Sequence, residues 1–234
     1  MKLQKIQTKL HGLADKEKAK ILQSFFKTGP GQYGEGDVFL GITVPVLRKA
    51  VKECGATSLP DVLQLLRSVI HEERLFALLL LIHAYASAQN PLKKKIYELY
   101  LRNTRYINNW DLVDLSAPNI VGNYLADKSR EPLYALARSR DLWKKRIAVL
   151  ATFYFIRQND FTDTLRITRI LLKDDHDLIH KAAGWMLREV GKRSLATEER
   201  FLKRYYKKMP RTMLRYAIER FPEVKRKKYL KGTM

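Results

Sequence analysis

Two residues near the middle of the chain, Trp110 and Asp114, have types and a spacing that suit chemistry on a positively charged group. They lie four positions apart, so a helix through this segment places both side chains on one face. An indole face attracts cations, and a carboxylate stabilises positive charge that develops in a transition state. Asn108 or Asn109 is suited to begin that helix, and Pro118 is expected to end it.

The surrounding sequence predicts an all-α fold with short connections. Apolar residues recur at helical spacing, for example at Leu63, Leu66 and Ile70. Prolines recur near expected helix starts, and polar residues suited to capping precede several apolar stretches. The capping candidates are Asp61, Asn90, Ser116, Asp141 and Asp160. No segment resembles a long linker, so one domain is predicted over residues 1–234.

A repeat of about 35 residues emerges when small residues inside the apolar helices are aligned. Ala77, Ala148, Ala183 and Ala217 have similar neighbours, at successive gaps of 71, 35 and 34 residues. Because the first gap is twice the others, a further member is expected near position 113, where Val113 lies. Basic residues accompany the four alanines, namely Arg74, Arg146, Lys181 and Arg215. Units that cannot bury their apolar faces alone stack into solenoids with a concave surface.

The central unit departs from this repeat at Asp114. In the other units the residue after the anchor is apolar or small, namely Leu78, Val149, Gly184 and Ile218. An ionised carboxylate at such a position is costly unless it is paired or functional, and an expected place near a helix C-terminus adds a second cost. Two hypotheses stay open here. Asp114 is either a functional carboxylate or a structural one that accepts hydrogen bonds from the backbone or from Arg146.

Cationic residues on the later helices indicate a surface for a polyanion. Trp143-Lys144-Lys145-Arg146 begins one helix, and Arg146 is suited to hold either a phosphate or Asp114. Lys181, Trp185 and Arg188 follow at i, i+4 and i+7, which makes one stripe with an aromatic residue between two cations. Such a stripe suits a nucleic-acid backbone, although a lone tryptophan in an apolar helix is more often a core residue.

The charge of the whole chain agrees with a polyanionic partner. Lys and Arg number 45 and Asp and Glu number 24, so the formal net charge is +21. Residues 201–234 hold 12 Lys or Arg and two Glu, which makes a strongly basic C-terminal segment. Nucleic acid is the usual partner of such a protein.

Other classes of protein are disfavoured. The single Cys54 excludes an internal disulfide framework and fits a reducing compartment. His176 and His180 are four residues apart but lack the glutamate and third ligand of a zinc site, so no metal is expected. No secretory signal is apparent, and the apolar run Leu75 to Ile82 is too short for a membrane span. We therefore expect a cytoplasmic protein.

The glycine-rich stretch over residues 29–37 lacks the Lys-Ser/Thr of a phosphate-binding loop, and no strand precedes it. We expect an ordinary loop whose glycines take positive φ.

Four ordered motifs, spread from about Ile21 to Tyr216, resemble those of the DNA alkylation repair family of AlkD type. The segments are Phe25–Asp37 with Phe39–Arg48, then Asn109–Asp114, Trp143–Ala148 and Lys181–Glu189. Asn109 stands where the best-known members have a second tryptophan, Phe25 where they have tyrosine, and Thr43 where they have glutamine. These departures place the chain in a sister branch.

The resemblance implies a right-handed solenoid of about six HEAT-like helical repeats with a concave, basic DNA-binding face. It implies hydrolysis of the N-glycosidic bond of cationic alkylated purines, such as 3-methyladenine and 7-methylguanine, without metal or cofactor. Matched to the family motifs, Asp114, Trp110 and Arg146 are the catalytic residues. The matched DNA-binding residues are Trp185, Lys181, Arg188, Thr43, Lys144 and Lys145.

An alkylated purine of this kind already carries positive charge and leaves without a proton. What remains is to stabilise the oxocarbenium-like sugar and to guide water, for which Asp114 is suited. Trp110 adds a cation–π contact, Trp185 a second wall, and Arg146 a clamp on the neighbouring phosphate. The expected partner is double-stranded DNA with alkylated bases, and the expected state is a monomer without an obligate protein partner.

Two alternatives to the enzyme stay open. One is a repeat protein of the same fold that binds DNA without chemistry, and the other is a scaffold that binds proteins. A carboxylate that faces phosphates weakens DNA binding, so Asp114 favours the enzyme over the pure binder.

Overall fold

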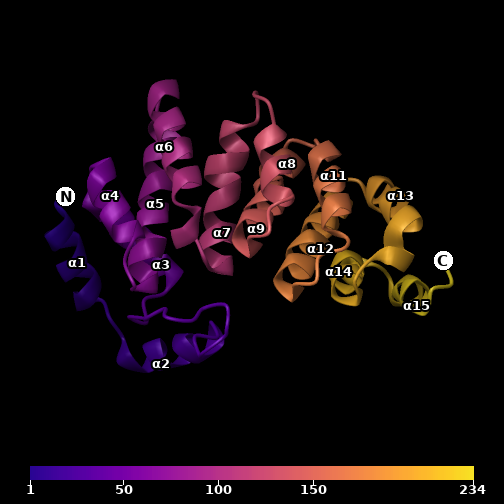
Figure 1. Cartoon of the computed structure of the whole chain (residues 1–234), viewed down its shortest axis with the longest axis horizontal. Coiled ribbons are helices and arrows are strands. Elements are labelled where there is room, and N and C mark those ends of the chain that lie inside the picture. Colours follow the sequence, from indigo (N-terminus) through magenta and orange to yellow (C-terminus); the bar gives the residue numbers. More distant parts are fainter. The chain divides into compact units, whose positions relative to one another are not determined.

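Every regular element of the computed structural model, which describes all 234 residues, is a helix (Figure 1). The predicted all-α fold is therefore confirmed. The one β-type pairing is an isolated bridge between Val38 and Ile70. No helix is long and apolar enough to cross a membrane. The chain forms two compact units, Met1–Leu112 and Val113–Met234.

The first unit is built around one long apolar helix, α5 (His71–Ser87). Helices α3 (Val44–Cys54), α4 (Leu59–Leu66) and α6 (Asn90–Arg102) pack against it. Helix α1 (Leu3–Gly12) lies beside α4, and α2 (Lys16–Phe25) runs crosswise at the end of the upright helices (Figure 1). A loop of residues 26–43 connects α2 to α3, and the short turn η1 (Thr104–Tyr106) follows α6.

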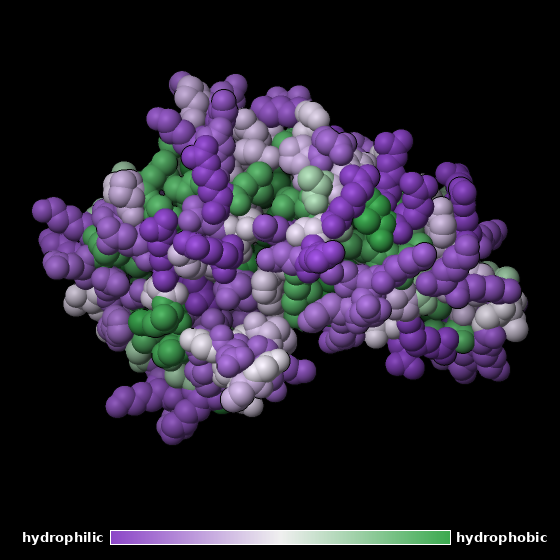
Figure 2. All heavy atoms as spheres, in the orientation of Figure 1, coloured by the Kyte–Doolittle hydropathy of each residue, from purple (hydrophilic) through white to green (hydrophobic).

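The second unit has α12 (Asp177–Gly191) at its centre. Around it pack α9 (Leu142–Ala151), α11 (Thr162–Leu171), α13 (Leu195–Tyr205) and α14 (Arg211–Ala217). Further elements of this unit are α8 (Glu131–Ala137), α10 (Phe153–Arg157), η3 (Tyr206–Lys208), η4 (Ile218–Arg220) and α15 (Glu223–Lys231). On the face drawn in Figure 2, hydrophilic side chains cover most of the surface and apolar ones show between them.

The residues that define the sequence repeat are core residues. Ala77, Val113, Ala148, Ala183 and Ala217 are all 0 % exposed, and each lies on a different helix, α5, α7, α9, α12 and α14 in order. Small residues beside them let helices approach closely. A Cβ added to Gly184 of α12 would lie 2.4 Å from the carbonyl oxygen of Met213 on α14. Contact this close leaves room for no larger side chain.

Helix α7 (Trp110–Ala117) ends directly before Pro118, as expected, but the chain does not leave a helical path there. The chain continues as a π-helix, η2 (Pro118–Gly122), and both flanking residues keep right-handed helical dihedrals. Proline has no N–H for the carbonyl of Asp114, and the wider i→i+5 spacing of a π-helix accommodates that loss. Asp114 is therefore not close to a helix terminus, and the dipole cost assigned to it from the sequence is absent.

Some capping predictions are confirmed and others are wrong. Asp141 caps α9, since its carboxylate accepts the N–H groups of Trp143 and Lys144 at 2.8 and 2.9 Å. Ser58, not Asp61, caps α4, and the expected cap Ser116 lies inside α7. Asn90 is the first residue of α6 rather than its cap.

Candidate active site

Helix α7 carries both residues that the sequence singled out, and each is partly exposed. Trp110 is its first residue, and Asp114 follows one turn later. Asn109 directly precedes the helix, and its side-chain oxygen accepts the N–H of Trp110, the first helical residue, at 2.8 Å. The first turn of α7 belongs to the first compact unit and the remainder to the second.

In the second unit, Asp114 forms a bidentate ion pair with Arg146 of α9. The guanidinium Nε and Nη2 donate to the two carboxylate oxygens at 2.8 Å each. The third donor group of Arg146, Nη1, is bound to the carbonyl of Leu178. The Arg146 side chain is only 5 % exposed, whereas that of Asp114 is 14 % exposed. Arg146 thus holds the carboxylate in one orientation, and its burial leaves it no free edge to clamp an external phosphate.

In the first unit, Trp110 stands against the aromatic end of α2. Its ring stacks on Phe26, with centroids 5.1 Å apart and an interplanar angle of 9°, and meets the edge of Phe25 at 6.0 Å. Phe25 is 61 % exposed, which is unusual for a large apolar side chain in a folded domain. Together these rings make an aromatic edge that is open to solvent on the side of Phe25.

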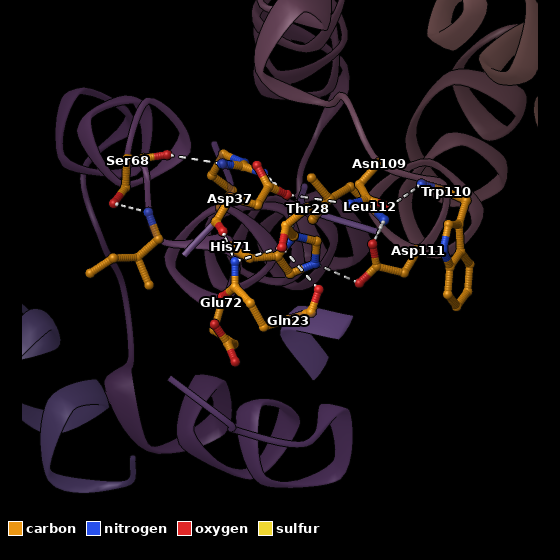
Figure 3. Close-up of polar contacts among 12 residues, drawn as sticks. Gln23, Thr28, Asp37, Ser68, His71, Glu72, Asn109, Trp110, Asp111 and Leu112 are labelled. Carbon is orange, nitrogen blue, oxygen red and sulfur yellow. Dashed lines mark hydrogen bonds and ion pairs between the residues drawn. The ribbon is translucent and has the colours of Figure 1, made fainter. Parts of the chain in front are cut away.

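A buried polar cluster lies behind this aromatic edge, with His71 at its centre (Figure 3). The Nδ1 atom of His71 is 3.0 Å from a carboxylate oxygen of Asp37, and Nε2 is 2.8 Å from one of Asp111. Arg74 donates to Asp37 at 2.7 Å, and the Asn109 amide donates to the same carboxylate at 3.3 Å. The cluster joins the 26–43 loop, α5 and the start of α7.

Contacts within the cluster change the pKa values of His71 and Asp37. Burial alone would lower the pKa of His71, but the charge of Asp111 and the hydrogen bonds to Asp111 and Asp37 outweigh it and raise that pKa to about 9. Burial likewise opposes ionisation of Asp37, yet its contacts with His71 and Arg74 lower the pKa of this carboxyl. His71 is therefore an imidazolium, and Asp37 is ionised, near neutral pH.

A second buried carboxylate, Glu72, fixes the end of the 26–43 loop. It accepts the backbone N–H groups of Leu40, Gly41 and Ile42 at 2.9, 2.8 and 3.2 Å. Gly41 has a φ of 84°, and a Cβ there would lie 2.1 Å from the carbonyl oxygen of Asp15. Earlier in the loop, Gly31 and Gly36 take positive φ as predicted, whereas Gly29 and Gly34 do not.

Thr43, the first of the expected DNA-binding residues, is exposed just before α3 and provides no capping hydrogen bond. It borders a cavity of about 210 Å³ that is walled largely by apolar side chains, including Phe26, Phe39 and Leu75. His71 and Asp111 of the buried cluster also line this cavity.

The stripe predicted on α12 is present, and all of its members have intramolecular partners. The Trp185 indole N–H donates to Glu189 at 3.0 Å, and its ring lies 5.8 Å from that of Phe153 on α10. Lys181 pairs with Asp177 at 2.6 Å, and Arg188 pairs with Glu219.

The two lysines at the start of α9 differ in their environment. Lys145 forms an ion pair with Asp174, and both side chains are largely buried. Lys144 is half-buried and forms no ion pair. Of the two, Lys144 needs no bond broken before it meets an anion.

The structure thus brings Asp114 and Arg146 together and places Trp110 on the same helix as Asp114, while Trp185 lies elsewhere on α12. Sequence reasoning missed the His71 cluster. A signal was present, because α5 begins with four buried polar residues, His71 to Arg74, before a largely apolar stretch, and unpaired burial of such groups is costly. Their partners are about 30 to 70 positions away, so no local spacing identifies them.

Comparison with known proteins identifies the family of the chain and agrees with its fold. A family profile described as DNA alkylation repair enzyme matches residues 6–221. Among solved structures, the chain resembles a predicted DNA alkylation repair enzyme from Enterococcus faecalis with a TM-score of 0.68. The identity is 16 %, over 90 % of this chain and 97 % of the other, so this likeness concerns the fold. No curated protein matched. Because the profile covers most of the sequence, the chain belongs to the DNA alkylation repair enzyme family.

Proposed function

We propose that the protein is a DNA glycosylase that excises cationic alkylated purines, such as 3-methyladenine and 7-methylguanine, from double-stranded DNA. The observation that carries this proposal is the Asp114 carboxylate. It is partly exposed and oriented through both oxygens by a buried arginine, one helical turn from a partly exposed tryptophan. Family membership supplies the class of damaged substrate.

In the proposed reaction Asp114 stabilises positive charge on the sugar. The alkylated purine departs as a neutral base, and the deoxyribose becomes oxocarbenium-like before water adds to its anomeric carbon. An aspartate whose orientation is already fixed needs no reorganisation when that charge develops, and removal of one preorganised group of this kind costs about 10²–10³ in rate. Arg146 acts here as a positioning residue, because its donors are engaged with Asp114 and Leu178.

Trp110 offers its indole to the cationic nucleotide. Cation–π attraction of this kind contributes up to about 2 kcal/mol in a desolvated site. In this proposal Trp185 and Thr43 are additional DNA contacts.

Phosphate contacts are assigned to the basic residues of α9 and α12. Lys144 forms no ion pair, and Lys181 is held by a surface pair of a kind worth less than about 1 kcal/mol, so both are available to DNA. Lys145 and Arg188 must first leave Asp174 and Glu219. We therefore expect Lys144 and Lys181 to contribute more to DNA affinity than Lys145 and Arg188.

One observation favours a non-catalytic DNA-binding protein of the same fold. A bidentate Asp114–Arg146 pair between α7 and α9 is also what a purely structural tie between helices looks like. The two functions differ in a direct test. The protein is incubated with duplex DNA that carries 7-methylguanine, and the free base is measured by chromatography. Release above the spontaneous rate supports the glycosylase, and binding without release supports the alternative.

A further inference from the structure

We propose that His71 is a positioning residue for base excision, since it joins Asp37 to Asp111 and so fixes the ring of Trp110 on α7. This inference rests on the proposed function. It assigns a role to the buried cluster of Asp37, His71, Arg74, Asn109 and Asp111, none of which contacts DNA in the mechanism above.

The hydrogen bonds of His71 join two segments of the chain. Both ring nitrogens lie within 3.0 Å of carboxylate oxygens, Asp37 on one side and Asp111 on the other, and the ring is 2 % exposed. A carboxylate only accepts, so both nitrogens must donate, and a ring that donates twice is an imidazolium. The cation therefore ties the loop before α3 to the first turn of α7 with two charge-assisted hydrogen bonds.

A continuous series of aromatic contacts leads from His71 to Trp110. The imidazole stacks on Phe39 at 4.5 Å and 20°, and it lies 5.0 Å from Phe26. Phe26 stacks in turn on Trp110 at 5.1 Å and 9°. A shift of the His71 ring is thus transmitted through one phenyl ring to the indole.

The same cluster also holds the backbone of Trp110. Asn109 is fully buried; its amide donates to Asp37, and its oxygen accepts the N–H of Trp110. Asp111, on the other side of Trp110, is the second partner of His71. Figure 3 shows the indole directed away from the polar groups while the residues on both sides of it are bound to them.

Three elements carry the charged groups that surround the His71 ring. Asp37 is in the loop, Asp111 is on α7, and Arg74 is on the same helix as His71. Glu72 borders the same cavity but is engaged by the backbone of the loop. Loss of the imidazolium proton leaves one nitrogen as an acceptor that faces a carboxylate oxygen, which breaks one of the two ties.

The test begins with wild-type protein, which needs no variant. The ring signals of His71 are followed by NMR between pH 5 and 10.5 after backbone assignment. We expect an imidazolium at pH 7 that titrates near pH 9, as its raised pKa of about 9 implies. A ring that is neutral at pH 7 would overturn the proposal.

The second measurement follows Trp110 itself. Trp143 and Trp185 are replaced by phenylalanine, so that of the three tryptophans in the chain only Trp110 remains. We expect its emission to change over the pH range in which His71 titrates, and His71→Gln to abolish that change. His83→Gln, an exposed position on the same helix, is the matched control and should retain it. Emission independent of pH in the presence of His71 contradicts the coupling.

The third measurement is single-turnover release of 7-methylguanine by His71→Gln in the otherwise unchanged protein. We expect the rate to fall about 10- to 100-fold, the range that a misplacement of about 1 Å produces, while DNA affinity stays within about threefold. A wild-type rate overturns the proposal. If wild-type protein releases no base, the proposed function fails, and the NMR and emission results still decide whether His71 positions Trp110.

Discussion

Glu198 of α13 allows a quantitative test of how the second unit is packed. Its side chain is 2 % exposed, one carboxylate oxygen has no hydrogen-bond partner, and the other lies against Gly191 of α12. Burial, together with the neighbouring charge of Glu199, raises the pKa of Glu198 to about 8. The folded protein therefore holds this carboxyl in its neutral form at pH 7.

The perturbation is Glu198→Gln, which keeps the shape and removes the ionisation. Between pH 4.5 and about 8 the wild-type folded state binds a proton that the unfolded chain has lost, so wild-type stability falls as the pH rises through this window. The full rise of the pKa from 4.5 to about 8 corresponds to about 5 kcal/mol, and relaxation of the site reduces it to about 2–4 kcal/mol.

The assay is thermal unfolding of both proteins at pH 5 and at pH 9. We expect equal melting temperatures at pH 5 and, at pH 9, a gain of about 8–16 °C for the variant in the transition of the second unit. Glu199→Gln is the matched control: it removes an ion pair with Lys225 and should show no comparable gain. A difference between Glu198→Gln and wild type that is the same at both pH values would show that Glu198 is already ionised in the fold.

Three further predictions concern packing and DNA. Gly184→Ala should destabilise the protein by about 1–3 kcal/mol in denaturant titrations, because its Cβ meets the Met213 carbonyl at 2.4 Å; unchanged stability would mean that α12 and α14 pack less closely. The affinity for undamaged duplex DNA should fall steeply between low and physiological salt, as phosphate contacts require, and a flat profile would favour a protein scaffold. Trp110→Ala should lower the free energy of unfolding by less than the roughly 3–5 kcal/mol lost when a fully buried aromatic residue is truncated, and yet it should slow base release strongly. Trp185→Ala should slow base release less. A large loss of stability without a change in the rate of base release would show that both tryptophans are core residues.

Much of the fold was predictable because it depends on local rules. Each helix buries one face, and this produces the helical periodicity and the repeat of small residues in the sequence. The five anchor positions of that repeat are fully buried. The π-helix at Pro118 was not predictable, since the usual effect of an internal proline is to end or kink a helix.

The sequence predicted which site residues share a helix, but not which residues of other helices they contact. The i, i+4 spacing of Trp110 and Asp114 placed them on one helix, but the choice between a free and a paired Asp114 depended on α9, which lies about 30 residues away. The basic residues beside the repeat anchors are an example, because the sequence did not reveal their ion-pair partners. Arg74 and Arg146 contributed to a net charge that suggested phosphates, yet both are buried against carboxylates from earlier in the chain or on a neighbouring helix.

The central claim is that the Asp114 carboxylate performs base excision, and Asp114→Asn tests it most directly. The amide keeps the size of the side chain and one oxygen for Arg146, but it removes the charge that would stabilise the sugar. Single-turnover release of 7-methylguanine from duplex DNA is measured for wild type and variant, with circular dichroism and DNA affinity as controls for folding and binding. We predict a loss of about 10²-fold or more in rate with DNA affinity within a few-fold of wild type. Release by the folded variant at the wild-type rate would contradict the account.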